Sequence, residues 1–91
     1  MRVSFYATLE PIVGQRKVEL PLAAGARVAD LVDALAARWP DLGEHLMDRD
    51  GHLSRRVNIF VGGRNVRWLQ GLETPLESDQ SIDIFPPVAG G

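Results

Sequence analysis

The stretch VADLVDALAARW, residues 28–39, decides the fold of this 91-residue chain. Its apolar side chains recur at the spacing of an α-helix and leave charged residues on the opposite face. Asp30 lies in the first turn, where the helix dipole favours an anion, and Pro40 follows the last apolar residue. The pattern predicts one amphipathic helix of about three turns that lies against a sheet. The residues expected to face that sheet are Val28, Leu31, Val32, Leu35 and Trp39.

Before this helix, residues 1–22 have the period-two pattern of strands. Residues 2–8 alternate between polar and apolar side chains, and the alternation resumes around Val18 and Leu20. Pro11 lies between the two runs and interrupts the first. These features predict an antiparallel hairpin with a loose turn.

After the helix, residues 41–56 are mixed and polar. We expect a short helix at residues 42–47 and a turn at residues 48–51. Residues 57–61, VNIFV, have the β-branched and aromatic side chains of a strand and end at two glycines. A short extended piece at residues 65–68 would complete a second hairpin.

The last strand is predicted at residues 82–85, IDIF, just before two prolines that cannot donate to a sheet. The order strand, strand, helix, strands predicts an α+β fold of the β-grasp type, a mixed four- to five-stranded sheet packed on one main helix. The chain length suits one domain with one core, expected over residues 1–85. Residues 86–91 are expected to form a flexible C-terminal tail that ends in diglycine.

Composition excludes several functions. The formal net charge is −2, and no cluster of Lys or Arg provides the positive surface that nucleic acids or anionic lipids need. No apolar run approaches the roughly 20 residues that span a membrane, and no signal peptide is recognisable, so we expect a cytoplasmic protein. Cysteine is absent, so the chain has no thiol nucleophile of its own.

The tail Pro86-Pro87-Val88-Ala89-Gly90-Gly91 has the composition of a segment that enters another protein. Six extended residues reach roughly 20 Å, which is enough to enter a deep pocket. Glycine lacks a Cβ atom, so it can pass a narrow channel and let another group approach its carbonyl closely. A frayed chain end is the alternative reading.

The stretch IDIFPPVAGG at residues 82–91 closely resembles the end of MoaD/ThiS sulfur carriers, and the order of elements upstream resembles their ubiquitin-like β-grasp fold. The resemblance covers essentially the whole chain. Residues 57–61, 66–67 and 71–76 look most like the CysO branch, the carriers of cysteine biosynthesis.

The resemblance implies a two-step activation of the chain end. A MoeB/ThiF-type adenylyltransferase would use ATP to adenylate the Gly91 carboxylate, and a sulfurtransferase or other sulfur donor would then convert it to a thiocarboxylate. The chain would bind no cofactor and supply no catalytic group, so it would be a carrier and not an enzyme. The residues expected to enter partner active sites are Pro87, Val88, Ala89, Gly90 and Gly91.

The acceptor of the sulfur stays open at this point. A cysteine synthase is favoured, and a molybdopterin synthase large subunit is the alternative, with this chain as the small subunit of that enzyme. The family also implies a possible JAMM-type metalloprotease that releases the carrier. A ubiquitin-like covalent modifier and a plain binding module are further alternatives; Lys17, the only lysine, is the single internal acceptor.

Four residues are candidates for docking of partners: Phe60, Phe85, Arg67 and Trp68. Phe60 and Phe85 lie on predicted strands near the tail and could equally be core residues. Trp68 is expected either to pack at the sheet edge or to contact a partner. Arg67, with other arginines of this region, could form a basic rim or simply a solvated face. His45 and His52 match no metal-ligand spacing, so no metal is expected.

Overall fold

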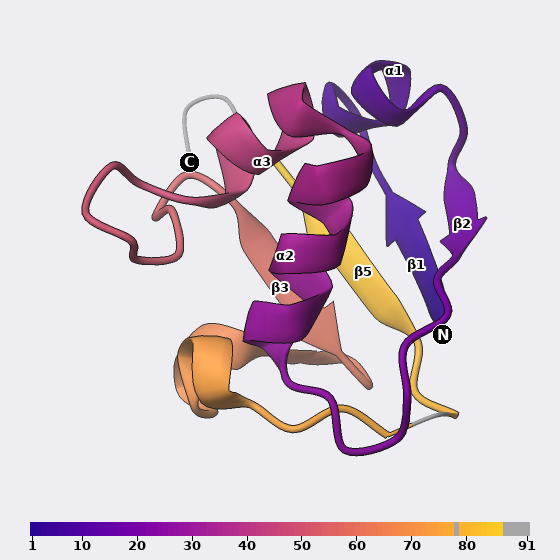
Figure 1. Cartoon of the computed structure of the whole chain (residues 1–91), viewed down its shortest axis with the longest axis vertical. Coiled ribbons are helices and arrows are strands. Elements are labelled where there is room, and N and C mark those ends of the chain that lie inside the picture. The colour runs from indigo at the N-terminus through magenta and orange to yellow at the C-terminus, as the bar shows by residue number, and fades with distance from the viewer. Residues whose placement is uncertain (78, 87–91) are drawn as a thin grey trace.

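Five strands form one mixed sheet, and helices cover one of its faces in the computed structural model, which describes residues 1–77 and 79–86 (Figure 1). The strands are β1 (Arg2–Phe5), β2 (Lys17–Glu19), β3 (Asn58–Val61), β4 (Arg64–Asn65) and β5 (Ile82–Phe85), in the sheet order β2-β1-β5-β3-β4. The helices are α1 (Leu9–Val13), α2 (Val28–Arg38) and α3 (Pro40–Leu46), with 3₁₀ turns η1 (Val66–Trp68) and η2 (Gly71–Glu73). The predicted β-grasp architecture is confirmed.

The first and last strands lie side by side at the centre of the sheet. β1 pairs with β5 in parallel, with Val3 opposite Ile82, whereas the other neighbouring strands are antiparallel. Because side chains alternate along a strand, Ile82 and Ile84 point into the core and leave Phe85 on the other face. This register places the end of β5 beside the ends of β1 and the start of β3.

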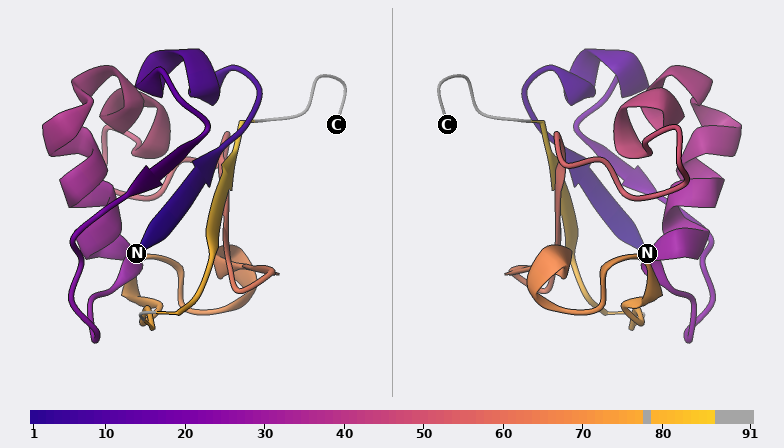
Figure 2. Two further views of the ribbon diagram at one scale, coloured as in Figure 1. Left: turned by 90° about the vertical axis from the view of Figure 1, so that its right-hand side faces the viewer. Right: turned by 90° about the vertical axis from the view of Figure 1, so that its left-hand side faces the viewer.

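The core lies between the sheet and α2. Figure 2 shows α2 and α3 on one side of the strands. The predicted helix stripe is buried, as Val28, Leu31, Val32 and Leu35 are all 2% exposed or less. Trp39 is partly buried and its ring meets that of Phe5 edge to face, with centroids 6.2 Å apart. Each fully buried aliphatic side chain contributes roughly 1.5–3 kcal/mol, so this stripe is the main reason why the helix stays docked.

The hairpin prediction is confirmed for β1 and β2, but its connection contains a helix that the sequence pattern did not predict. The sequence pattern identifies Pro11 only as an interruption of the first strand. It lies in the first turn of α1, where backbone N–H groups have no intrahelical partner, so proline is tolerated there. Gly14 ends the helix with φ 88°, and its N–H donates to the Glu10 carbonyl at 2.8 Å.

Two other local predictions can be compared with the structure, and one of them differs from it. The extended piece at residues 65–68 is wrong, since β4 ends at Asn65 and Val66–Trp68 is a 3₁₀ turn. The Asn65 side chain accepts a hydrogen bond from the Arg67 N–H at 3.0 Å, and this local contact favours the turn. The short helix at residues 42–47 is confirmed as α3, and Pro40, expected only to stop the preceding helix, also starts this one.

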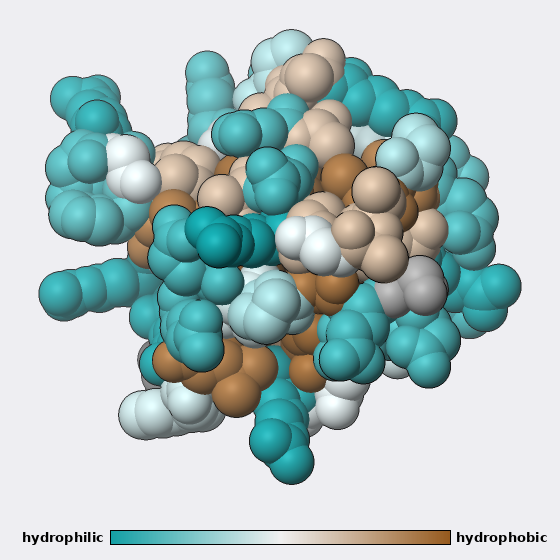
Figure 3. Space-filling view, turned by 60° about the horizontal axis from the view of Figure 1, so that its bottom comes forward, coloured by the Kyte–Doolittle hydropathy of each residue, from teal (hydrophilic) through white to brown (hydrophobic). Residues whose placement is uncertain are grey.

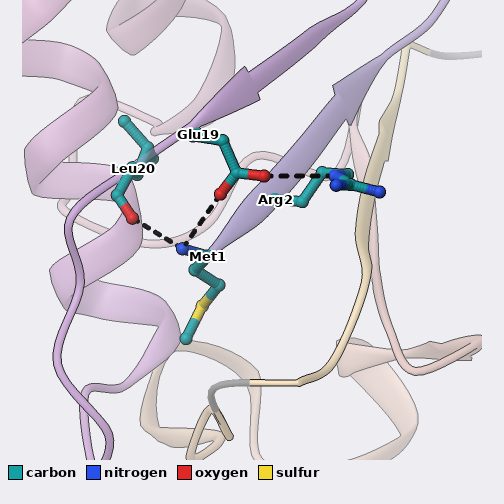
Figure 4. Close-up of polar contacts among 4 residues, drawn as sticks. All are labelled: Met1, Arg2, Glu19 and Leu20. Carbon is teal, nitrogen blue, oxygen red and sulfur yellow. Dashed lines mark hydrogen bonds and ion pairs between the residues drawn. The ribbon is translucent and has the colours of Figure 1, made fainter.

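The first residue helps to hold β1 against β2. The Met1 nitrogen donates to the Leu20 carbonyl at 2.7 Å and lies 3.5 Å from Glu19 Oε2 (Figure 4). The other oxygen of Glu19 accepts from Arg2 Nε at 3.1 Å, and this hydrogen bond lowers the pKa of the Glu19 carboxyl below its ordinary value. The Met1 contact is partly buried and extends the pairing of the two strands, whereas the Arg2–Glu19 pair is exposed and adds little stability.

Gly43 allows α3 to approach α2 closely. A Cβ atom at position 43 would lie 2.7 Å from Ala36 Cβ and 3.1 Å from Ala36 Cα. We therefore expect Gly43→Ala to lower the free energy of unfolding by about 1–3 kcal/mol, because overpacking outweighs the gain in helix propensity of about 1 kcal/mol. Urea denaturation would measure the change.

The matched control for this prediction is the double variant Ala36→Gly/Gly43→Ala. It removes the closest atom, so its loss of stability should be smaller than the sum of the two single losses. Additive losses would show that the two helices do not clash at this point.

Candidate functional site

An aromatic cluster lies on the sheet face opposite α2, at the end where β5 finishes. The Phe85 ring stacks on the Tyr6 ring, with centroids 4.2 Å apart and an angle of 9°. Phe60 meets Phe85 edge to face at 5.5 Å. All three side chains are partly exposed, and none belongs to the buried core. The cluster therefore offers an apolar surface directly before Pro86.

The sheet register explains why these three residues meet. Phe85 is opposite Asn58 in the antiparallel pair of β5 with β3, and Phe60 lies two residues further along β3 on the same face. Tyr6 follows β1, whose parallel pairing with β5 carries it alongside Phe85. The predicted docking residues Phe60 and Phe85 are thus brought together, although both could have been core residues from the sequence alone.

Tyr6 is a member of this surface that the sequence reasoning missed. Its hydroxyl donates to Asp83 Oδ1 at 2.8 Å, and this hydrogen bond raises the pKa of the Tyr6 hydroxyl above its ordinary value. The contact joins the end of β1 to β5 and holds the Tyr6 ring flat against Phe85. The alternation of residues 2–8 places Tyr6 on the strand face that points away from the core. This alternation is the signal in the sequence that could have identified Tyr6 as a member of the surface.

Arg67 and Trp68 lie on η1, at the edge of the sheet next to β3. Arg67 Nη2 donates to the Ser54 carbonyl at 2.9 Å and to the Val57 carbonyl at 2.7 Å. Its guanidinium therefore holds the chain that leads into β3. Trp68, in contrast, is 84% exposed, so the alternative that it packs at the sheet edge is wrong.

The described part of the molecule has several surface hollows, and the larger ones lie at opposite ends of β3. One of about 530 Å³ lies beside the root of the tail and is lined, among others, by His45, Arg49, Arg56 and Pro86. Figure 3 shows one face of the molecule, on which patches of apolar residues lie between polar residues. A hollow of about 470 Å³ lies where β3 ends, and it includes Val61, Leu69 and Pro75. The predicted site residues Pro87, Val88, Ala89, Gly90 and Gly91 lie outside the described residues.

Within residues 1–77 and 79–86, no three His, Cys, Asp or Glu side chains are close enough to hold a metal ion. His45 and His52 have separate local contacts. His45 Nδ1 is 2.8 Å from the Asp41 carbonyl oxygen, one turn earlier in α3. His52 Nδ1 is 2.9 Å from Asp50 Oδ2, in the turn before β3. These contacts give each ring a structural partner.

The pair His52 and Asp50 predicts a measurable pH dependence. The hydrogen bond that His52 Nδ1 donates to the Asp50 carboxylate raises the pKa of the His52 imidazole above its ordinary value of about 6.5. The pair contributes its stability in full below the pKa of the unfolded histidine and loses it as the pH rises through the raised pKa of the folded protein. We expect an NMR titration of His52 to show a midpoint above 6.5.

The control is Asp50→Asn, which keeps the size of the side chain and removes its charge. The His52 midpoint should then move down toward 6.5. An unchanged midpoint would mean that Asp50 does not set this pKa.

Comparison with known proteins shows to which family this chain belongs. The family profile described as ThiS family matches residues 3–91. The chain is 34% identical to small archaeal modifier protein 3 of Haloferax volcanii, over 100% of this chain and 98% of the relative. It is 36% identical to the sulfur carrier protein CysO of Mycobacterium tuberculosis, over 98% of this chain and 96% of the relative.

A solved structure from the same group of proteins shares the fold of this chain. The crystal structure of the BexX/CysO complex of Amycolatopsis orientalis contains a chain that superposes with a TM-score of 0.83 at 31% identity, covering 99% of this chain and 98% of the other. The fold and the full-length relatives thus place the chain in a class of ubiquitin-like β-grasp proteins that includes sulfur carriers and protein modifiers. The chain belongs to the ThiS family. In the described part of the chain, no helix is long and apolar enough to cross a membrane.

Proposed function

We propose that this protein is a sulfur carrier whose Gly91 carboxylate is adenylated and then converted to a thiocarboxylate. The observation that carries the proposal is the match of the ThiS family to residues 3–91, a range that includes the terminal Gly90-Gly91. Full-length similarity to the sulfur carrier protein CysO supports the same assignment.

The chemistry requires a partner enzyme because a carboxylate is a poor electrophile. A Gly91 oxygen attacks the α-phosphorus of ATP, pyrophosphate leaves, and an acyl adenylate forms. Hydrosulfide released by the sulfur donor then attacks the carbonyl carbon, AMP leaves with the bond electrons, and loss of the sulfur-bound proton gives the thiocarboxylate. The protein acts as a macromolecular group carrier and contributes binding and orientation, not acid or base groups.

The aromatic cluster gives this activation a docking surface. Tyr6 and Phe60 both contact Phe85, the residue that precedes Pro86 at the start of the tail. An adenylyltransferase that covers these rings would bury apolar surface, and aromatic side chains are enriched at the centres of such interfaces. We expect activation in the cytoplasm, where ATP is available.

The sulfur acceptor proposed here is a cysteine synthase, because the chain is 36% identical to CysO over nearly its whole length. A molybdopterin synthase large subunit is the alternative acceptor. A JAMM-type metalloprotease would release the carrier after transfer. Complementation distinguishes the acceptors: rescue of a strain that lacks its CysO carrier would support the cysteine route, and rescue only of a strain that lacks MoaD would refute it.

Activation itself is tested by ATP–pyrophosphate exchange. The MoeB/ThiF-type adenylyltransferase of the source organism should catalyse exchange only when this chain is present. Exchange that is independent of the chain, or no exchange at all, would contradict the proposal.

Covalent protein modification is the second candidate, favoured by the 34% identity to small archaeal modifier protein 3. Aminolysis of the same acyl adenylate by a lysine amine would form an isopeptide bond and release AMP. Immunoblots of cells that express tagged protein would show conjugates of higher mass if this occurs. Their loss on deletion of Gly91 would separate covalent conjugates from tight complexes.

A further inference from the structure

Tyr6 is bound to β5 by three separate contacts at the point where that strand ends. Its backbone N–H donates to the Ile84 carbonyl at 3.2 Å, and its hydroxyl donates to Asp83 Oδ1 at 2.8 Å. Its ring stacks on the ring of Phe85, with the centroids 4.2 Å apart. The contacts reach three successive residues of β5, so this one residue holds the end of the strand through both its backbone and its side chain.

The pairing of β1 with β5 explains how one residue makes all three contacts. The two strands run side by side in the same direction, toward the end of the molecule that carries α1 (Figure 1). Phe5 is opposite Ile84, so Tyr6 comes to lie beside Phe85. Asp83 and Phe85 are two positions apart and share the face that points away from the core. A ring stacked on Phe85 can therefore place its hydroxyl on Asp83.

Tyr6 is itself held by the turn that follows it. Its carbonyl accepts a hydrogen bond from the Leu9 N–H at 3.1 Å, at the start of α1. The next residue, Ala7, has φ 53°, a left-handed conformation that is uncommon for any residue other than glycine. Such a conformation persists only where the surrounding structure determines the backbone. The chain turns at Ala7 from the sheet into α1, and Tyr6 is a fixed point against which the end of β5 is held.

The end of β5 is also the start of the tail. Phe85 is followed by Pro86, which has no N–H group to donate to a neighbouring strand. Five extended residues beyond Pro86 span roughly 17 Å, so a change of about 10° in their starting direction moves the far end by roughly 3 Å. Misplacement of a reacting group by about 1 Å can lower a rate about 100-fold. The direction of the chain at Phe85 therefore affects where the Gly91 carboxylate lies in an enzyme.

We infer that Tyr6 is a positioning residue for adenylation, because its hydrogen bond to Asp83 fixes the direction in which the chain leaves β5 while the aromatic cluster is docked on the enzyme. The inference rests on the proposed function and divides Tyr6 into two parts. The ring contributes to docking, and the hydroxyl orients the tail. Without the hydroxyl, the carrier docks as before but places its carboxylate correctly in fewer of the complexes, which lowers kcat and leaves KM unchanged.

The test is the dependence of ATP–pyrophosphate exchange on carrier concentration, with the full-length chain and the adenylyltransferase of the source organism. Tyr6→Phe should lower kcat by about 3- to 10-fold, the effect of one hydrogen bond, and change KM by less than about twofold. Asp83→Ala should have the same effect, and the double variant should be no worse than either single variant, since both remove one contact. Asp83→Asn should keep most of kcat, because its amide oxygen still accepts a hydrogen bond.

Gly43→Ala is the control for a merely structural role. It is expected to destabilise the packing of α3 on α2, in the helix layer, and should keep the kcat of the wild type. A fall in kcat for Gly43→Ala similar to that for Tyr6→Phe would assign the effect to stability and contradict the inference.

The hydrogen bond can be measured without the enzyme. Tyr6 is the only tyrosine, so the absorbance of the phenolate reports its titration alone. Asp83→Ala should lower the midpoint, because the bond to Asp83 raises the pKa of the Tyr6 hydroxyl. An unchanged midpoint would show that the bond is absent in solution and would overturn the inference.

The exchange assay separates this inference from the proposed function. An active wild type with an unchanged kcat for Tyr6→Phe, whether or not KM rises, would overturn this inference alone. A wild type without exchange would overturn the proposed function as well.

Discussion

Replacing Gly90 by valine is expected to lower kcat/KM for adenylation by about 100-fold or more. A valine side chain places a branched Cβ next to the reacting end of the chain, where only a backbone without Cβ is expected to pass the channel of the enzyme. Misplacement of a reacting group by about 1 Å can cost a factor of this size. Carrier-dependent ATP–pyrophosphate exchange measures the effect.

Two further tail variants make this prediction specific. Deleting Gly91 should abolish thiocarboxylate formation, because the next carboxylate is one residue too far from the adenylating site. Val88→Ala, which adds no atoms to the same tail, should stay within a few-fold of the wild type. Equal activity of Gly90→Val and the wild type would show that the tail does not enter a narrow channel.

Replacing Phe5 by alanine is expected to lower the free energy of unfolding by about 3–5 kcal/mol. Phe5 is fully buried and contacts Trp39 at the end of α2, so its loss opens a cavity between the sheet and the helix layer. Small domains have about 5–15 kcal/mol of stability in total, so the variant should be close to unfolding at 37 °C. Urea denaturation followed by circular dichroism measures the change.

Phe5→Leu is the control for this change, since it keeps most of the apolar volume and should cost only about 1.5 kcal/mol or less. Similar losses for both variants would mean that the cost is not set by the apolar volume lost between β1 and α2.

The helices and strands whose apolar residues recur at a regular spacing were predictable from the sequence. The helix at 28–38 and the strand at 82–85 follow from apolar spacing alone. α1 was missed because a proline interrupts a short pattern, and the effect of that proline depends on its position within the turn. η1 was missed because it depends on side chains of Asn65 and Arg67 that bind backbone groups.

The candidate site was predictable only in part. Phe60 and Phe85 were identified, but their contact depends on the register of β3 with β5, which a single sequence does not give. Tyr6 joins them through the parallel pairing of β1 with β5, across most of the chain. The role of Arg67 in holding Ser54 and Val57 is a tertiary contact that looked like a solvated charge. The residues expected to react, Gly90 and Gly91, stay predictions.

The mass of the chain after activation tests the central claim most directly. The protein would be incubated with its adenylyltransferase, ATP and a sulfur source, and its intact mass measured. Conversion of the Gly91 carboxylate to a thiocarboxylate should add about 16 Da, the difference between sulfur and oxygen. The gain should require ATP and be absent from the variant that lacks Gly91. An unchanged mass for the complete chain, with an enzyme that is active on another carrier, would contradict the account.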